Sequence, residues 1–124
     1  MNLLDSSVWL EYLSEGPNAS QYHEPFSDVS SILVPTICLY EVFKIVLRET
    51  DENKAIQSVA LMKQGSVVDL TEDIAVMAAK FSSELKLPMA DSVILSTARK
   101  YNAVIWTQDA DFRNLTNVKF FPKR

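Results

Sequence analysis

The sequence predicts an α/β protein in which a parallel sheet is covered by helices on both faces. Short apolar runs alternate along the chain with longer segments whose apolar residues recur at the helical spacing. One run, residues 103–107, is continuously apolar, which is typical of a strand buried on both faces of a parallel sheet. The 124 residues contain no repeat, linker or low-complexity segment, so we expect one domain spanning residues 1–124.

The first third of the chain is expected to form two strands separated by helices. Residues 3–4 form a short strand, and the two serines that follow can cap a helix, which ends near Gly16. A second short helix is expected around residues 21–22, limited by Pro25 because proline cannot donate a backbone hydrogen bond. Residues 31–34 are the second predicted strand.

Two helices are expected between the second and third strands. The first starts at Thr36, directly after Pro35, which stops the preceding strand. Residues 51–63 continue as another helix with a regular apolar spacing. Gly65 breaks this pattern, and residues 66–70 form the third predicted strand.

Helical periodicity returns after the third strand. Thr71 is a suitable cap, and two acids follow it in the first turn, where the helix dipole favours negative charge. The apolar stripe of this helix is predicted to consist of Ile74, Met77, Ala78, Phe81 and Leu85. The remaining elements are a helix at residues 89–101, a strand at 103–107, a turn at 109–112 and a last strand at 118–121.

Composition argues against several classes of function. The chain has 12 Lys+Arg and 16 Asp+Glu, a net charge of −4, which does not favour simple electrostatic binding of nucleic acid or anionic lipid. Two glycines are too few for a Gly-rich phosphate loop, and one histidine argues against His-rich metal sites and His-based triads. A single cysteine and an N-terminus without a basic leader or membrane span lead us to expect a cytoplasmic protein that binds no membrane.

Two pairs of acidic residues lie where structure alone explains them poorly. Asp5 directly follows the first strand and Asp109 follows the fourth, and ligands of open α/β sheets bind beyond the carboxyl ends of strands. Glu41 and Asp91 each lie on the apolar face of a helix, where an unpaired carboxylate is costly. Simpler explanations remain open, because the two aspartates can cap the elements behind them and Glu41 can pair with Lys44.

Taken together, these acids predict a metal site. Each of them falls near the start of a helix or turn, so one layer of the fold can hold all four. The four residues are Asp5, Glu41, Asp91 and Asp109. Clustered carboxylates repel one another unless cations neutralise them, and hard oxygen ligands without His or Cys suit Mg²⁺ or Mn²⁺. Such ions activate water for attack at phosphorus. The expected chemistry is therefore phosphodiester hydrolysis.

Four short segments around these acids form a recognisable set. They are residues 3–8 (LLDSSV), 40–42 (YEV), 89–94 (MADSVI) and 107–112 (TQDADF). In order and spacing the chain resembles PIN-domain ribonucleases, and more closely the small VapC-type toxins of prokaryotic toxin–antitoxin pairs. The opening Asp-Ser-Ser departs slightly from the more frequent Asp-Thr-Ser of that family.

The resemblance implies a three-layer PIN-like fold, with a parallel four- to five-stranded sheet flanked by helices. It implies a metal-dependent endoribonuclease whose cofactor is Mg²⁺ or Mn²⁺, with catalytic and metal-binding roles for Asp5, Glu41, Asp91 and Asp109. Asp111 is an alternative to Asp109, and Ser6 and Thr107 would position the water or a carboxylate. The family's implied partners are an RNA substrate, a cognate antitoxin protein and a second copy of the chain in a homodimer.

Two other functions would use the residues differently. A phosphoacceptor receiver domain could use Asp69, Thr107 and Lys119, but it needs paired acids in its first loop and leaves Glu41 and Asp91 unexplained. A non-catalytic PIN-like binding module would have no need of a complete set of acids.

Basic residues gather near the C-terminus despite the net negative charge. Residues 99–124 contain six of them against two acids, so 6 − 2 = +4; the six are Arg99, Lys100, Arg113, Lys119, Lys123 and Arg124. Our hypothesis is that this stretch forms part of an RNA path, with a merely solvated basic face as the alternative.

Overall fold

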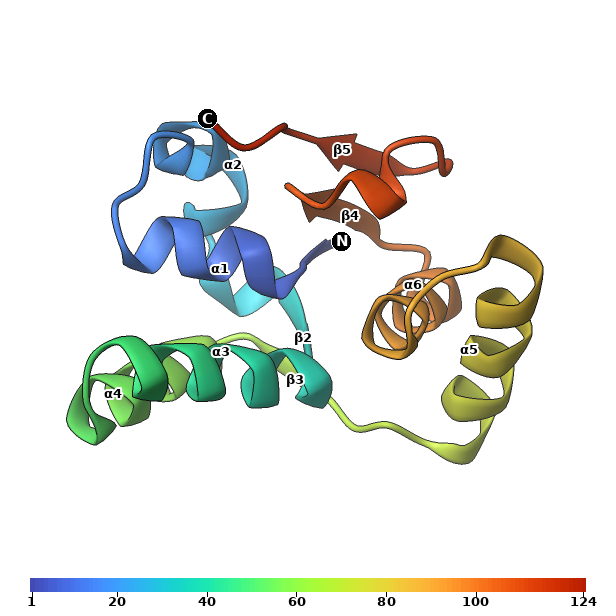
Figure 1. Ribbon diagram of the computed structural model, residues 1–124, viewed down its shortest axis with the longest axis horizontal. Helices are drawn as coiled ribbons and strands as arrows, with labels where there is room; N and C mark the ends of the chain where they lie inside the picture. Colours follow the sequence, from blue (N-terminus) through green and yellow to red (C-terminus); the bar gives the residue numbers. More distant parts are fainter.

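The computed structural model describes residues 1–124 and contains a five-stranded sheet with the strand order β3-β2-β1-β4-β5. Every neighbouring pair of strands is parallel. The strands are β1 (Asn2–Leu4), β2 (Ile32–Pro35), β3 (Ser66–Val68), β4 (Val104–Thr107) and β5 (Val118–Phe120). The predicted fold class, an α/β protein with a parallel sheet flanked by helices, is confirmed (Figure 1).

Six α-helices and three short 3₁₀ helices connect the strands. The α-helices are α1 (Ser6–Leu13), α2 (His23–Phe26), α3 (Thr36–Glu49), α4 (Glu52–Met62), α5 (Glu72–Leu85) and α6 (Met89–Tyr101). The 3₁₀ helices are η1 (Ala19–Tyr22), η2 (Val29–Ser31) and η3 (Ala110–Phe112). Figure 1 shows α3 and α4 as one pair at the lower left and α5 and α6 as another at the right.

The strand order reverses between β1 and β4. From β1 the chain moves outward to β2 and β3, and then returns across the sheet to β4 and β5 on the other side of β1. Leu4 at the end of β1 pairs in register with Trp106 on β4. In open α/β sheets the ligand crevice lies at such a reversal, outside the carboxyl ends of the strands. The topology therefore predicts a binding site among the residues that follow β1 and β4.

The core lies between the sheet and the helices that pack on it. Helix α6 is the most deeply placed, since all residues from Ser92 to Ala98 are buried. Its buried hydroxyls find backbone partners: Ser96 Oγ donates to the Ile74 carbonyl at 2.8 Å and Thr97 Oγ1 donates to the Val93 carbonyl at 2.8 Å. Because these polar groups are satisfied, α6 can be buried without an unpaired donor.

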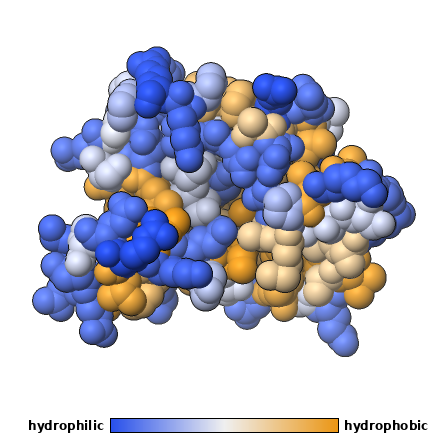
Figure 2. All heavy atoms as spheres, viewed as in Figure 1, coloured by the Kyte–Doolittle hydropathy of each residue, from blue (hydrophilic) through white to orange (hydrophobic).

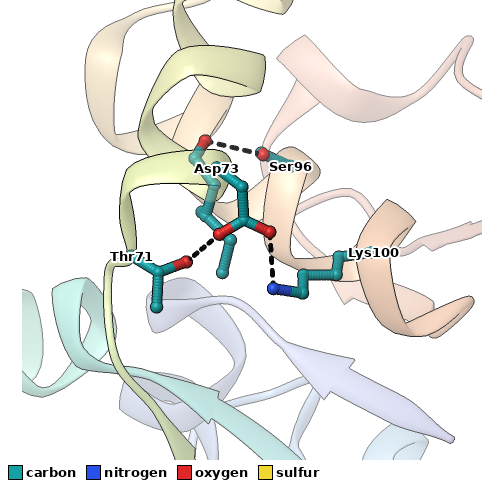
Figure 3. A network of polar contacts seen from close by, with 5 residues as sticks. Thr71, Asp73, Ser96 and Lys100 are labelled. Carbon is teal, nitrogen blue, oxygen red and sulfur yellow. Dashed lines mark hydrogen bonds and ion pairs between the residues drawn. The ribbon is translucent and has the colours of Figure 1, made fainter.

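A polar contact ties the start of α5 to the end of α6 (Figure 3). Lys100 Nζ donates to Asp73 Oδ2 at 2.5 Å, and the hydroxyl of Thr71 donates to the other oxygen of the same carboxylate. The hydrogen bond from Lys100, followed by that from Thr71, lowers the pKa of Asp73 from 3.8 to about 2. Asp73 therefore stays ionised and keeps this contact through the whole neutral pH range.

The apolar stripe predicted for α5 is partly wrong. Ile74 and Ala78 are buried, but Met77 is 43% exposed and Leu85 is 44% exposed. Helix α5 packs chiefly against α6, and Val68 at the end of β3 is the sheet residue beside its buried side chains, so α5 buries only a narrow face.

A few boundaries also differ from the prediction. Pro35 is the last residue of β2, and the third strand ends at Val68 and not at residue 70. The short helix expected near residues 21–22 is the 3₁₀ helix η1, and it leads into α2, which contains Pro25. The proline is tolerated there because the first N–H groups of a helix have no intrahelical acceptor. None of the helices combines the length and the apolar character that crossing a bilayer would require.

Candidate active site

Asp5 follows β1 and Asp109 follows β4, as the sequence predicted, and the structure shows that these two strands are paired. The backbone N–H of Asp5 donates to the Trp106 carbonyl at 3.1 Å, which holds the ends of the two strands together. Both aspartates also act as caps: Asp5 accepts from the Val8 N–H of α1 and Asp109 accepts from the Asp111 N–H of η3. The capping explanation is thus correct for both residues, and the remaining question is whether the side chains do more than cap.

The carboxylate of Asp5 is buried, with only 3% of the residue exposed. It accepts hydrogen bonds from Ser7 Oγ at 2.5 Å, from Thr107 Oγ1 at 2.5 Å and from the Val8 N–H at 3.2 Å. Burial raises its pKa from 3.8 to about 6, against the lowering effect of these donors, and the charge of Asp109 adds to the rise. A cap on the surface has no such shift, so Asp5 lies in a pocket that penalises its charge.

Glu41 lies on α3 and is partly buried. It accepts a hydrogen bond from Ser6 Oγ at 2.8 Å, which connects α3 to the start of α1. The alternative pairing with Lys44 is absent, because the Lys44 ammonium lies over the ring of Tyr40, 5.6 Å from its centroid. Glu41 therefore has no cationic partner that would explain its position on the apolar side of the helix.

The thiol of Cys38 lies near enough to three of the acids for their charges to affect it. Its Sγ contacts the Leu4 carbonyl at 3.9 Å beneath the carboxyl end of β1. Burial raises the pKa of Cys38 well above its ordinary value, and the charges of Asp5, Glu41 and Asp91 each add to that rise. The thiol stays protonated, which agrees with the inert role expected for a buried cysteine.

Asp91, Asp109 and Asp111 form the tightest group of acids. One carboxylate oxygen from each lies within 4.8 Å of the others. Burial raises the pKa of Asp91 from 3.8 to about 8, and the charges of Asp109, Asp111 and Asp5 add to the rise. None of these carboxylates lies within 4.0 Å of a Lys, Arg or His nitrogen.

The structure thus brings the predicted acids to one end of the sheet, with two refinements. Asp109 and Asp111, which the sequence offered as alternatives, both lie beside Asp91. Asp5 and Glu41 lie outside that tight group and are held by the neighbouring serines, Ser7 and Ser6.

Thr107 links two of the acids. Its Oγ1 donates to Asp5 and accepts from the backbone N–H of Asp109 at 2.8 Å. Gln108, which the sequence analysis did not single out, extends this link, since its backbone N–H donates to Ser7 Oγ at 3.1 Å and its Nε2 donates to the Ser7 carbonyl at 3.1 Å. The one signal in the sequence that could have identified Gln108 is its position between Thr107 and Asp109.

The donor set fits a hard divalent cation. All the side chains in the tight group offer carboxylate oxygens, the ligands that Mg²⁺ and Mn²⁺ prefer. The raised pKa values of Asp5 and Asp91 show that their negative charge is not compensated by the protein itself. A bound cation would supply that compensation.

Comparisons with known proteins agree with this geometry. A family model described as the PIN domain matches residues 3–118. A search of proteins with curated functions finds no match.

Solved structures with the same fold include a toxin–antitoxin complex from Klebsiella pneumoniae, with 21% identity, a TM-score of 0.81 and coverage of 98% of this chain and 99% of that chain. The toxin VapC20 from Mycobacterium tuberculosis, described as cleaving the sarcin–ricin loop, has 15% identity, a TM-score of 0.77 and coverage of 90% and 92%. VapBC2 from Rickettsia felis, bound to a DNA fragment from its promoter, has 16% identity, a TM-score of 0.76 and coverage of 98% and 97%. At these identities the likeness establishes the fold.

Proposed function

Starting from the fact that this chain belongs to the PIN-domain family, we propose that it is a metal-dependent endoribonuclease that acts as the toxin of a toxin–antitoxin pair. The observation that carries the proposal is the group of Asp91, Asp109 and Asp111, whose carboxylate oxygens lie within 4.8 Å of one another at the reversal of strand order. Two of the structural neighbours support it, since one is a toxin–antitoxin complex and the other is a toxin described as cleaving the sarcin–ricin loop.

The proposed cofactor is Mg²⁺, with Mn²⁺ as the alternative, held by Asp5, Glu41, Asp91 and Asp109 with Asp111 beside them. When bound, such an ion supplies an activated water and offsets negative charge that develops at phosphorus. The carboxylates of this chain provide the oxygen ligands and the excess negative charge that attract it. In the absence of a cation, the raised pKa of Asp91 lets its carboxyl group keep a proton near neutral pH.

The neighbouring hydroxyl groups orient the carboxylates. Ser7 and Thr107 each donate to one oxygen of Asp5, so both oxygens of that carboxylate are fixed in direction. Ser6 does the same for one oxygen of Glu41. Groups that orient metal ligands in this way typically change metal affinity or activity about 10–100-fold when they are removed.

The proposed partners are an RNA substrate, a cognate antitoxin and a second copy of the chain. An apolar cleft of about 630 Å³ between α1, α3 and α4, lined by residues such as Leu10, Leu13, Ile45 and Leu61, offers a surface for a partner's apolar side chains. Tyr40 and Leu47 on α3 are exposed apolar residues of the kind that a homodimer would cover.

The receiver-domain alternative does not agree with the topology. Asp69 follows β3, an edge strand separated from β1 by β2, so it lies away from the group of acids around Asp5. A non-catalytic PIN-like module remains the alternative to the enzyme, and only activity separates the two.

The test is cleavage of RNA by the purified protein with Mg²⁺ or Mn²⁺ and with a chelator. We expect Asp91→Asn to lower the cleavage rate about 100-fold or more, because it removes one of the carboxylates proposed to hold the metal ion. The matched control is Asp69→Asn, which neutralises an exposed acid outside the site and should cleave like wild type. Wild-type cleavage rates in Asp91→Asn, or no metal-dependent cleavage by the wild type, would overturn the proposal.

A further inference from the structure

A polar cleft adjoins the carboxylates on the side of the C-terminus. It has a volume of about 390 Å³, and its lining includes Ser6, Ser7, Glu11, Gln108, Lys123 and Arg124. We refer to it as the tail cleft. Ser6 and Ser7 are the residues whose hydroxyls donate to Glu41 and Asp5, so the tail cleft lies directly beside these two acids.

The two cations of the tail cleft are free. Lys123 and Arg124 are exposed, and neither lies within 4.0 Å of a carboxylate oxygen. The acid in the cleft, Glu11, is occupied at one oxygen by the backbone N–H of Asn18, 2.7 Å away.

Most other basic residues of the C-terminal stretch are engaged elsewhere. Arg99 donates to the carbonyl and hydroxyl of Thr116, and Lys100 pairs with Asp73. Lys119 lies 4.0 Å from a carboxylate oxygen of Glu24, and its ammonium is 4.5 Å from the centroid of a Trp106 ring. Arg113 is exposed and lies outside the tail cleft, so the stretch is not one continuous basic surface, and the tail cleft holds two of its unpaired cations.

A buried hydrogen-bond network fixes the backbone that carries these cations. Asn18, only 1% exposed, donates from Nδ2 to the Pro122 carbonyl at 2.9 Å and to Gln108 Oε1 at 2.7 Å. Gln108 in turn bonds to Ser7, which bonds to Asp5. The residue before Lys123 is thus tied to the same loop that holds the acids.

The views of the whole molecule agree with this placement. In Figure 1 the C-terminus lies beside α2 and near α1. In Figure 2 hydrophilic side chains cover that corner of the molecule.

We propose that Lys123 and Arg124 bind backbone phosphates of the RNA strand that leads into the group of acids. The inference rests on the proposed function and names the part of the chain that holds the substrate next to the cleavage site. Two free cations at one cleft are donors of the kind that proteins use to position phosphates. Apolar lining is limited to Leu10 and Ile45, which offers little to anchor a peptide.

The test measures RNA affinity in the Asp91→Asn background with Mg²⁺ present, so that the RNA is not consumed. We expect Lys123→Ala/Arg124→Ala to weaken binding of a single-stranded RNA about 10-fold at moderate salt. The slope of log K against log salt should fall in magnitude by about 1.4, since each phosphate contact on a single strand contributes about 0.7. The matched control, Lys63→Ala/Lys80→Ala, removes two exposed charges far from the tail cleft and should leave both quantities unchanged.

A second variant tests the anchoring. Asn18→Ala should weaken RNA binding when the tail is intact and have little further effect in Lys123→Ala/Arg124→Ala, because the two changes act on one contact. Equal losses in both backgrounds would contradict the anchoring. Thermal melts of every variant show whether each one remains folded.

The possible results distinguish a failure of RNA binding at the tail cleft from a failure of the proposed ribonuclease function. If wild type cleaves RNA but the tail variant binds with unchanged affinity and salt slope, the inference is wrong and the proposed enzyme stands. If the tail controls RNA affinity but wild type shows no metal-dependent cleavage, the enzyme is wrong and the binding site stands. If the tail variant loses binding of a hexaglutamate peptide and keeps its RNA affinity, the tail cleft binds an acidic protein segment and the RNA assignment is overturned.

Discussion

Replacing Asp5 by asparagine should change how the stability of the metal-free protein depends on pH. The carboxylate is 3% exposed and lies near another acid, so its charged form is disfavoured in the folded state. Asparagine has nearly the same shape but does not titrate, and it can still accept the hydrogen bonds of Ser7 and Val8.

The magnitude follows from the pKa shift. Folding raises the pKa of Asp5 from 3.8 to about 6, so the folded protein binds this proton more tightly than the unfolded chain does. The stability that the carboxyl group contributes is complete below pH 3.8 and is lost as the pH rises through about 6. This rise in pKa corresponds to about 3 kcal/mol in the free energy of unfolding. Wild type loses this stability as the pH rises, and Asp5→Asn does not.

The assay is urea denaturation followed by circular dichroism, in EDTA, at several values from about pH 4 to about pH 7. The measured quantity is the difference in unfolding free energy between variant and wild type, which should grow by about 2 kcal/mol in favour of the variant from about pH 4 to about pH 7. Asp69→Asn, an exposed acid outside the site, serves as the control and should run parallel to wild type. If Asp5→Asn also runs parallel to wild type, Asp5 does not lie in a pocket that penalises its charge and the reasoning is refuted.

Three further predictions concern the same site and the α5–α6 contact. Mg²⁺ at 100 times its dissociation constant should stabilise wild type by about 2.7 kcal/mol, seen as a rise in Tm, and should stabilise Asp91→Asn much less; equal rises would contradict binding at this carboxylate. Thr107→Val should slow RNA cleavage about 10–100-fold, because Asp5 loses the donor that orients one of its oxygens, and an unchanged rate would show that this orientation does not matter. Lys100→Ala should raise the pKa of Asp73 from about 2 toward 3.8 in an NMR titration, since the hydrogen bond from Lys100 is the main cause of the lowering; an unchanged value would mean that the contact is absent in solution.

The sequence was sufficient where local pattern and topology act together. Helix α6 begins and ends at the predicted residues, because Pro88 precedes it and an unbroken apolar periodicity runs to Tyr101. The positions of Asp5 and Asp109 after the ends of strands were predicted from a general property of parallel sheets, in which ligands bind beyond the carboxyl ends of the strands, and the structure adds that β1 and β4 are neighbours.

Contacts between distant segments could not be predicted in the same way. Nothing local indicates that Asn18 meets Gln108 and Pro122, which lie 90 and 104 residues away along the chain. The choice between Asp109 and Asp111 likewise depended on the 3₁₀ turn of η3, which places both beside Asp91.

The six basic residues near the C-terminus show a related difficulty. A count of charge along the chain cannot tell a cation that is already paired, such as Lys100, from one that is free, such as Arg124. Pairing depends on which helices and strands lie alongside, and this is decided by tertiary packing.

The central claim is that this group of acids binds a divalent ion that supports RNA cleavage. It is tested most directly by the rate of RNA cleavage as a function of Mn²⁺ concentration, for wild type and Asp91→Asn under identical conditions. For wild type we predict a cleavage rate that rises to saturation with Mn²⁺. For Asp91→Asn we predict a cleavage rate that is lower by about 100-fold or more at every Mn²⁺ concentration. A wild-type rate that does not depend on Mn²⁺, or a variant whose curve matches that of wild type, would contradict the account.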